Sequence, residues 1–276
     1  MREPRSITAL RHAVLLVFVA ISLYPALNVL SISLRPGNRL RSTDLSIIPA
    51  DWTLDSYIEL FTEQPFLLWM LNSIVVASMV TVTGVALASI GGYAFSRFRF
   101  VGRKATMLAI LTTQMFPATM LLLPLYILIA KLRLVDTYLG LMVFYTSTAL
   151  PFCVWQMKGF YDTIPTALEE AARIDGCGRG AAFWRVILPL ALPGLVITAL
   201  FSFMAAWSEY IVAAQVMQDE RMFTLPLGLK SFQASLSTQW GLYAAASILV
   251  SLPVVVVFLV LSKYLVSGLT LGSVKE

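Results

Sequence analysis

Long apolar stretches separated by short polar loops dominate the pattern of this chain. A helix of roughly 20 mostly apolar residues is long enough to cross the ~30 Å hydrocarbon core of a bilayer. Lipid offers no partner for backbone N–H and C=O groups, so a helix, which satisfies them internally, is the expected spanning element. The pattern therefore predicts an all-α integral membrane protein with six transmembrane helices, at about 12–34, 70–95, 105–130, 137–157, 187–214 and 241–263.

Composition supports this class and indicates an orientation. Of the 276 residues, 58% are hydrophobic and 13% are charged, whereas soluble domains contain about 25% charged residues. With the N-terminus in the cytoplasm, thirteen of the 20 Lys and Arg residues fall on the inner side, as the positive-inside rule requires. The net charge of +5 then reflects topology and contact with anionic lipids rather than nucleic-acid binding. We expect both termini to be cytoplasmic.

Residues suited to catalysis or metal binding are scarce. His12 is the only histidine, which argues against a histidine metal site or a catalytic triad. Cys153 and Cys177 form no C-x-x-C pair and are expected to be small buried hydrophobes. The chain also lacks a glycine-rich phosphate-binding loop. We therefore expect no catalytic residue, no metal and no cofactor in this chain.

Small residues and prolines mark two of the predicted spans. Gly84, Ala88 and Gly92 are spaced by four, which places them on one helical face and favours close helix packing. Pro117 and Pro124 interrupt the third apolar stretch and predict a kinked helix. Such a kink occurs both in helices that line a transport pathway and in ordinary membrane helices.

Two further segments are candidates for function. Residues 54–61 have apolar positions at helical spacing and predict a short amphipathic helix on the outer surface, either a connector or part of a landing surface for an outside partner. Glu209 is an ionisable residue inside an apolar stretch, and such residues usually face a bundle interior, a cavity or a partner. The alternative is an interfacial position among belt aromatics. The candidate pathway residues are Trp207, Ser208, Glu209 and Tyr210.

The best-patterned polar segment is the loop at 163–189, between the fourth and fifth spans. Pro165 suits the first turn of a helix and Gly176 suits its C-terminal stop. A second short helix is expected through residues 183–186. The sequence thus predicts a helix, a glycine turn and another helix, a shape that can fit into a cleft on another protein.

The spacing in this loop resembles the cytoplasmic signature of bacterial ABC importer permeases: E-A-A, three residues, Gly, nine residues, an Ile-like residue, one residue and Leu-Pro. Here it reads Glu170-Ala171-Ala172, Gly176, Val186 and Leu188-Pro189, with Val where Ile is usual. Residues 54–61, 206–210, 223–229 and 266–275 also resemble the smaller six-span permease of maltose-type sugar importers, with Ser208 replacing the usual Asn and Tyr210 the usual Phe. The likeness covers most of residues 50–276.

This resemblance implies a type-I ABC importer permease fold with a cytoplasmic coupling helix. The chain itself would not be an enzyme, since ATP and Mg would be bound by a homodimer of separate ATPase subunits. The other implied partners are a second permease subunit, an outside solute-binding protein, membrane lipids and a carbohydrate substrate, with no nucleic acid. The implied location is the bacterial cytoplasmic (inner) membrane, which the chain crosses several times.

The resemblance also assigns roles to residues. The ATPase-coupling residues would be Glu170, Ala171, Ala172, Asp175, Gly176, Leu188 and Pro189. A second ATPase contact would lie in the C-terminal tail, at Gly272, Val274 and Lys275. Candidate contacts with the binding protein are Asp219, Glu220, Ser231, Phe232 and Gln233.

Three regions follow from this interpretation. Residues 1–69 hold the first span and the outer amphipathic segment, residues 70–263 hold the transmembrane core with five spans, and residues 264–276 form a cytoplasmic tail. The predicted function is ATP-driven import of a carbohydrate, such as a maltose-like disaccharide, by alternating access. The alternatives are import of another small polar solute, such as a polyol or glycerol phosphate, and a secondary transporter.

Overall fold

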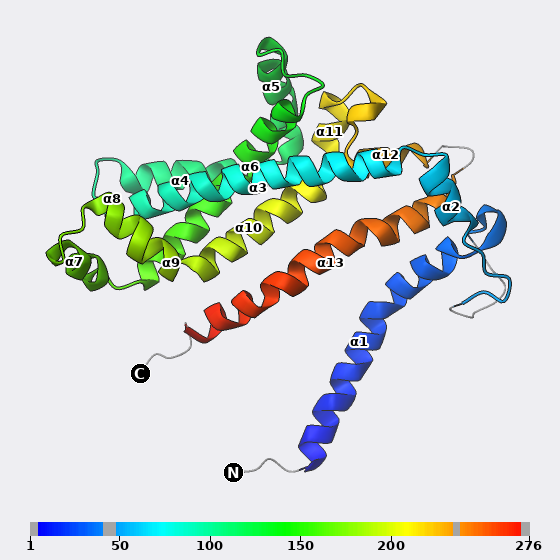
Figure 1. Cartoon of the computed structure of the whole chain (residues 1–276), viewed down its shortest axis with the longest axis horizontal. Coiled ribbons are helices and arrows are strands. Elements are labelled where there is room, and N and C mark those ends of the chain that lie inside the picture. Colours follow the sequence, from blue (N-terminus) through cyan, green and yellow to red (C-terminus); the bar gives the residue numbers. More distant parts are fainter. Residues whose placement is uncertain (1–4, 41–47, 234–237, 272–276) are drawn as a thin grey trace. The chain divides into compact units, whose positions relative to one another are not determined.

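The computed structural model describes residues 5–40, 48–233 and 238–271, and its described part is helical, without strands. The predicted all-α class is confirmed (Figure 1). The longer helices are α1 (Arg5–Ser33), α3 (Phe66–Arg97), α5 (Ala118–Lys131), α6 (Tyr138–Thr163), α10 (Leu192–Trp207) and α13 (Trp240–Leu271). The shorter ones are α2 (Asp55–Thr62), α4 (Arg103–Thr113), α7 (Ala167–Ile174), α8 (Arg179–Ala182), α9 (Leu188–Leu190), α11 (Ile211–Val216) and α12 (Leu225–Ser231).

Within the described residues, four helices are long and apolar enough to cross a membrane: Ile7–Ser33, Phe66–Arg97, Tyr138–Thr163 and Trp240–Tyr264. A fifth span results if the pair Arg179–Leu190 and Leu192–Trp207, bent by 76°, is taken as one span. The membrane class is therefore confirmed, but the count of six continuous spanning helices is not.

The third predicted span, 105–130, is wrong as a single helix. The stretch is divided into α4 and α5, of 11 and 14 residues, and Pro117 is the N-cap of α5. Proline has no N–H to donate and pushes the residue before it out of the helical region. The helix is thus interrupted at Pro117, as predicted, but the interruption is a complete break between α4 and α5 rather than a kink.

The fifth predicted span, 187–214, is also interrupted. Ala191 separates α9 from α10, and residues 208–210 separate α10 from α11. Apolar content alone does not reveal these breaks, because each piece is as hydrophobic as a continuous span would be.

The chain divides into two compact units, one of residues 1–67 and 228–252 and the other of residues 68–227 and 253–276. In the larger unit, α3 packs against α6 and α10 through small residues. A Cβ added to Gly92 would lie 2.7 Å from Met157 Cβ, and one added to Gly84 would lie 3.1 Å from Ser202 Oγ. Ala88 is fully buried on the same face. This face packs tightly, as its spacing predicts.

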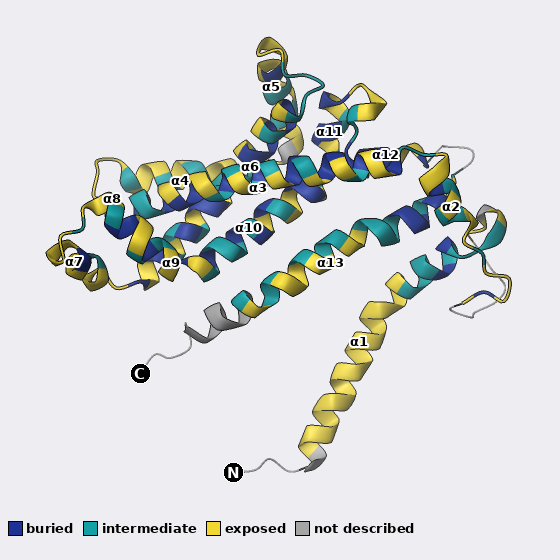
Figure 2. Cartoon of the chain, viewed as in Figure 1, coloured by how far each residue is buried: buried dark blue, intermediate teal, exposed yellow. Residues whose placement is uncertain are grey.

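The larger unit also has a hydrophobic core around the loop that follows α6. Met157, Tyr161 and Ile164 from the end of α6 are buried with Phe183 and Ile187 from a π-helical turn at Phe183–Ile187 (Figure 2). Because apolar groups on the loop pack against apolar groups on the helix, the loop is held as part of the folded unit rather than as a free connector.

In the smaller unit, the short amphipathic helix predicted at residues 54–61 is present as α2. Leu60 is fully buried, and Tyr57 forms a hydrogen bond of 2.8 Å with Ser33 at the end of α1. Ile58 and Phe61, on the same helix, stay exposed. Most of α1 is also exposed and apolar, as expected for a helix whose surroundings are lipid or other membrane helices.

Candidate functional site

The loop at 163–189 contains the helix, glycine turn and helix that its sequence predicts. Ile164 is extended, as expected for a residue before proline, and α7 begins two residues after Pro165. At the other end of α7, Gly176 has φ +87°. Gly176 N donates to Arg173 O (3.1 Å) and Cys177 N donates to Ala172 O (2.9 Å). These two bonds form a Schellman motif, which explains why the helix stops at a glycine.

The short helix α7 has one face against the protein and another in solvent. Ala172 is buried and packs inward, together with Ala182 of α8. Leu168, Ala171 and Ile174 are exposed, Ile174 with 86% of its surface. The apolar residues of α7 are therefore split between an inward-facing alanine and an exposed apolar surface, which is what a helix needs if it must be held by one protein and contact another.

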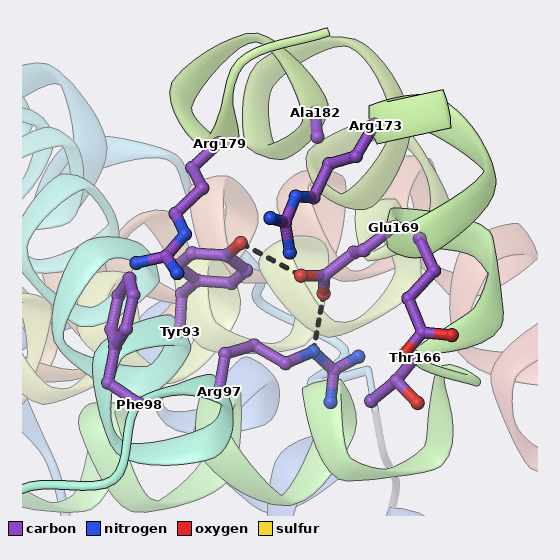
Figure 3. A pocket seen from close by; sticks show the side chains of 9 residues that line it. Tyr93, Arg97, Phe98, Thr166, Glu169, Arg173, Arg179 and Ala182 are labelled. Atoms are coloured by element: carbon purple, nitrogen blue, oxygen red, sulfur yellow. Dashed lines mark hydrogen bonds and ion pairs between the residues drawn. The ribbon is translucent and has the colours of Figure 1, made fainter. Parts of the chain in front are cut away.

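The two acidic residues of α7 have different environments. Glu170, the residue singled out by the sequence pattern, is exposed, and among the described residues no side chain pairs with its carboxylate. Glu169 is largely buried, and both of its oxygens are bound by residues of α3 (Figure 3). Tyr93 donates its hydroxyl to Oε2 (3.0 Å), and Arg97 Nε donates to Oε1.

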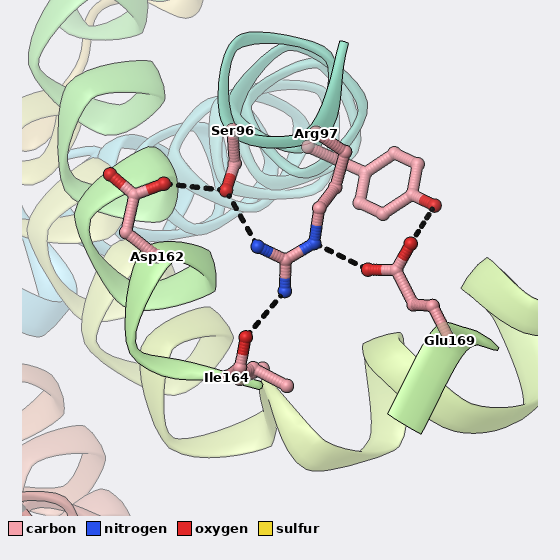
Figure 4. Close-up of polar contacts among 6 residues, drawn as sticks. Ser96, Arg97, Asp162, Ile164 and Glu169 are labelled. Carbon is pink, nitrogen blue, oxygen red and sulfur yellow. Dashed lines mark hydrogen bonds and ion pairs between the residues drawn. The ribbon is translucent and has the colours of Figure 1, made fainter. Parts of the chain in front are cut away.

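Arg97 binds three different groups at once (Figure 4). Beside Glu169, its Nη2 donates to the carbonyl of Ile164 (2.7 Å) and its Nη1 donates to Ser96 Oγ (3.1 Å). Ser96 in turn donates to Asp162 Oδ1 on α6 (2.6 Å). The guanidinium side chain is 9% exposed and that of Glu169 15% exposed. One side chain thus contacts both the end of α6 and the start of α7.

A polar pocket opens beside this ion pair (Figure 3). It is lined by Tyr93, Arg97, Phe98, Thr166, Glu169, Glu170, Arg173, Arg179 and Ala182. The Arg179 guanidinium lies over the ring of Phe98, 5.9 Å from its centroid. The Tyr93 ring packs against Phe183, with ring centroids 4.6 Å apart. The hydrogen-bonded groups are therefore backed by aromatic side chains on the inner side.

Tyr93, Arg97 and Glu169 were not among the predicted site residues. The loop pattern points to Glu170 rather than to its neighbour Glu169, and the positive-inside rule accounts for the charge of Arg97 without a partner. Some signal was available, since an acidic residue in the first turn of a helix is favoured by the helix dipole. Nothing in the local sequence shows that Arg97, 72 residues earlier, is its partner.

Two other predicted coupling residues lie at the far end of the loop. Leu188 is half-buried against the core beneath the loop, and Pro189 is exposed in the first turn of α9. Asp175 is the C-cap of α7 and is exposed. The residues predicted for the C-terminal ATPase contact, Gly272, Val274 and Lys275, lie outside the described residues.

The predicted pathway residues form the break between α10 and α11. Trp207 is buried, with its ring stacked 5.4 Å from that of Phe203. Ser208 donates to Met204 O (2.7 Å). The carboxylate of Glu209 accepts the backbone N–H groups of Val212 (3.0 Å) and Ala213 (3.3 Å). Tyr210 is the N-cap residue of α11. Glu209 therefore satisfies free N–H groups at the start of a helix, a role that was not among those predicted for it.

The predicted binding-protein contacts fall in both compact units. In the larger unit, Asp219 and Glu220 are exposed, and Asp219 Oδ1 accepts the N–H of Arg221 (2.9 Å). In the smaller unit, Phe232 is buried and Gln233 accepts a hydrogen bond from Lys230 Nζ (2.8 Å). Ser231 Oγ donates to Gly228 O (2.6 Å).

The segment at 218–225 is held by side chains from the other end of α3. Asn72 Nδ2 donates to the carbonyls of Arg221 (2.8 Å) and Phe223 (2.9 Å), and Asn72 Oδ1 accepts from the hydroxyl of Tyr138 (2.7 Å). Ser73 Oγ accepts the N–H of Leu225 (2.6 Å). This segment therefore has a fixed shape.

Asp136 supports the same segment from another side. It adopts a left-handed conformation (φ +59°), and its Oδ1 accepts the backbone N–H groups of Gln218 (3.1 Å) and Asp219 (3.2 Å). Its own N–H donates to Val216 O (3.0 Å). Asp is one of the few residues that adopt this conformation readily, so the turn places the carboxylate where the segment needs an acceptor.

Comparison with known proteins places these features in a family. Residues 81–270 match the family described as "Binding-protein-dependent transport system inner membrane component", a description of a transport component and not of an enzyme. The maltodextrin transport system permease protein MdxG of Bacillus subtilis is 38% identical, over 92% of this chain and 91% of its own. The maltose/maltodextrin transport system permease protein MalG of Escherichia coli K12 is 36% identical, over 100% of this chain and 99% of its own.

A solved structure agrees with the sequence relatives. A crystal structure of a bacterial ABC transporter involved in the import of the acidic polysaccharide alginate contains a similar chain. It aligns with a TM-score of 0.80 at 25% identity, over 96% of this chain and 99% of that chain. The breaks in the third and fifth spans thus occur in a chain that follows a known transporter fold over 96% of its length.

Proposed function

Because this chain belongs to the family of binding-protein-dependent transport system inner membrane components, we propose that it imports a carbohydrate as one permease subunit of an ATP-driven transporter. The observation that carries this proposal is the loop at 163–189. Its E-A-A residues lie on the short helix α7, which exposes Glu170 and ends in a Schellman glycine turn, and its Leu-Pro pair lies in α9. The family match includes the entire loop.

The exposed side of α7 suits a contact with a separate ATPase. Leu168, Ala171 and Ile174 offer apolar surface there, and Glu170 offers a carboxylate that pairs with no side chain in the described part of the chain. The hydrogen bonds of Glu169 and the buried alanines hold the helix from the other side. A homodimer of ATPase subunits would supply ATP and Mg, and its closure would displace α7. The displacement would reach the spans through packed helices, giving alternating access.

The remaining partners follow from the same family membership. A second permease subunit would complete the pathway, and a solute-binding protein would deliver the substrate on the outer side. The exposed carboxylates of Asp219 and Glu220, on a segment held by Asn72 and Asp136, would meet that protein. In this orientation the loop at 163–189 and both termini are cytoplasmic, in agreement with the distribution of Lys and Arg.

The proposed substrate is an oligosaccharide. Two relatives are named for maltodextrin transport, and the similar solved structure belongs to an importer of a polysaccharide. These proteins share linked sugars as their cargo, although the sugars differ in charge. A maltose-like disaccharide or a short maltodextrin is therefore the first substrate to test.

Reconstitution tests this proposal directly. The chain is placed in proteoliposomes with its ATPase, its second permease and its binding protein, and uptake of labelled maltodextrin is measured. Uptake should require ATP and all four components. Uptake by this chain alone, driven by an ion gradient, would instead establish a secondary transporter.

A variant of the exposed carboxylate tests the docking surface. Glu170→Ala should lower uptake and the amount of ATPase that copurifies with the permease, because it removes a charge from the contact surface. Glu63→Ala, an exposed acid outside the loop, is the matched control and should leave the copurifying ATPase unchanged. Normal copurification and normal uptake by the Glu170 variant would exclude the proposed contact.

A further inference from the structure

The connection between α6 and α7 is short, and among the described residues no backbone hydrogen bond joins the residues before Pro165 to those after it. α6 ends at Thr163 and α7 begins at Ala167, with Pro165 between them. Proline has no N–H, and the extended Ile164 leaves its carbonyl without a partner in the helix. If α7 were held only through this connection, a force applied to α7 would change its angle to α6 and would reach no other helix.

Arg97 spans that connection from outside. Its Nη2 binds the Ile164 carbonyl on one side of Pro165, and its Nε binds the Glu169 carboxylate on the other side. The guanidinium is planar, so these bonds have fixed directions relative to one another. A lysine at this position would be a single point charge and could not fix both directions. Arg97 therefore sets the angle between the end of α6 and the first turn of α7.

Arg97 is also the last residue of α3. Tyr93, one turn earlier on the same helix, holds the second oxygen of Glu169 (3.0 Å). Both oxygens of the carboxylate are thus bound by α3, and both donors lie within its last five residues. Since charge-assisted hydrogen bonds are short and about twice as strong as neutral ones, they hold the orientation of α7 relative to α3, which the covalent connection before α7 does not fix by itself.

We propose that Arg97 is the positioning residue of the loop at 163–189, and that it passes a displacement of α7 to α3. This inference rests on the proposed function, because it needs an ATPase that moves α7. It adds that α3, rather than the covalently connected α6 alone, receives the movement. Without Arg97, α7 would still dock on the ATPase, but part of its movement would be taken up at Pro165.

The test measures coupling rather than activity alone. In the reconstituted importer, the ratio of ATP hydrolysed to solute imported is determined for wild type, Arg97→Ala, Glu169→Gln and the double variant. This ratio does not depend on how much protein is correctly folded. We expect the ratio to rise by about tenfold in Arg97→Ala. The double variant should show no larger increase than Arg97→Ala, because both changes remove the same interaction.

The matched control is Lys158→Met. Lys158 pairs with Asp162 on the same helix, through Oδ2, whereas Ser96 donates to Oδ1, so the substitution removes none of the bonds that Arg97 makes. The Lys158→Met variant loses one positive charge near the same end of the bundle as Arg97. We expect it to keep the wild-type ratio of ATP hydrolysed to solute imported. A wild-type ratio in Arg97→Ala, or a double variant in which the two effects multiply, would overturn the role of Arg97.

A second measurement needs no transport. The full chain is placed in lipid nanodiscs, its two native cysteines are replaced by alanine, and spin labels are attached at the exposed positions Val101 and Ile174. One narrow distance distribution is expected for wild type and Lys158→Met, and a broadened distribution for Arg97→Ala. An unchanged distribution in Arg97→Ala would overturn the inference. Failure of ATP-driven uptake by the wild-type assembly would overturn only the proposed function.

Discussion

The two ends of α3 both hold a polar segment of the same compact unit, but they hold it by different chemistry. At the end near Asn72, neutral side chains bind backbone groups of residues 221–225. At the end near Arg97, charged and phenolic side chains bind the carboxylate of Glu169 on α7. Between the two ends, small residues pack α3 closely against α6 and α10.

The two kinds of bond suit different roles. Bonds to backbone groups fix the shape of a segment, and bonds to a side chain attach a helix that can move as a whole. Hydrogen bonds to backbone groups determine the path of the segment itself, because each bond fixes one peptide unit. A bond to a side chain leaves the backbone of α7 intact as a helix, and it connects that helix to α3 as one body. The Asn72 end is therefore suited to present a fixed surface, and the Arg97 end is suited to transmit a displacement.

The largest expected effect concerns the Asn72 end. Asn72 is 2% exposed, and Asn72→Leu, of similar size, would leave two carbonyls and the Tyr138 hydroxyl without their partner. Each buried polar group left unsatisfied costs about 1–3 kcal/mol, so we expect a loss of roughly 3 kcal/mol in the free energy of unfolding. Thermal unfolding of the purified chain in detergent measures this loss.

Asn28→Leu is the matched control for that prediction. Asn28 also donates through Nδ2 to a carbonyl, that of Tyr24 (3.0 Å), but both residues belong to α1. Its loss should change the stability little, because the bond joins no separate elements. Equal effects of the two variants would show that the bonds of Asn72 do not hold the segment at 218–225.

The sequence could predict features that depend on neighbouring residues. The stop of α7 at Gly176 follows from a glycine placed after an amphipathic run, and α2 follows from apolar spacing over eight residues. The break at Pro117 was predicted in kind but not in extent. Local rules of helix start, stop and interruption act over a few residues, so the sequence displays them directly.

The contacts that make the site depend on tertiary structure. Asn72 and Arg221 are 149 residues apart, and Arg97 and Glu169 are 72 residues apart. No local pattern relates them, because each pairing arises only when α3 packs against a segment far away in the sequence. Glu209 illustrates the same limit, since its helix cap exists only because the chain breaks at residues 208–210.

A smaller effect is expected at the glycine turn of the Arg97 end. Gly176→Ala places a side chain at φ +87°, a conformation that costs other residues about 1–2 kcal/mol. Hydrogen exchange of the α7 amides should therefore accelerate by about tenfold, which corresponds to about 1.4 kcal/mol. The control is Gly180→Ala, within the helix α8, where an added Cβ would have no other atom within 4 Å. Equal acceleration in both variants would show that the left-handed turn is not what holds α7.

The smallest expected effect separates the two ends by their charge. Raising the salt concentration from 0.1 M to 1 M shortens the Debye length from about 10 Å to about 3 Å. The ion pair of Arg97 and Glu169 is partly exposed, so its attraction should fall by a few tenths of a kcal/mol. Partly buried pairs are screened less than surface pairs, which is why the change should stay small.

The neutral bonds of Asn72 and Ser73 should not respond. Because 1.4 kcal/mol corresponds to a tenfold change, a few tenths of a kcal/mol should accelerate hydrogen exchange in α7 by about twofold. Exchange should stay constant at Leu225, whose N–H is bound by Ser73. An equal response at both sites would show that charge does not distinguish the two ends of α3.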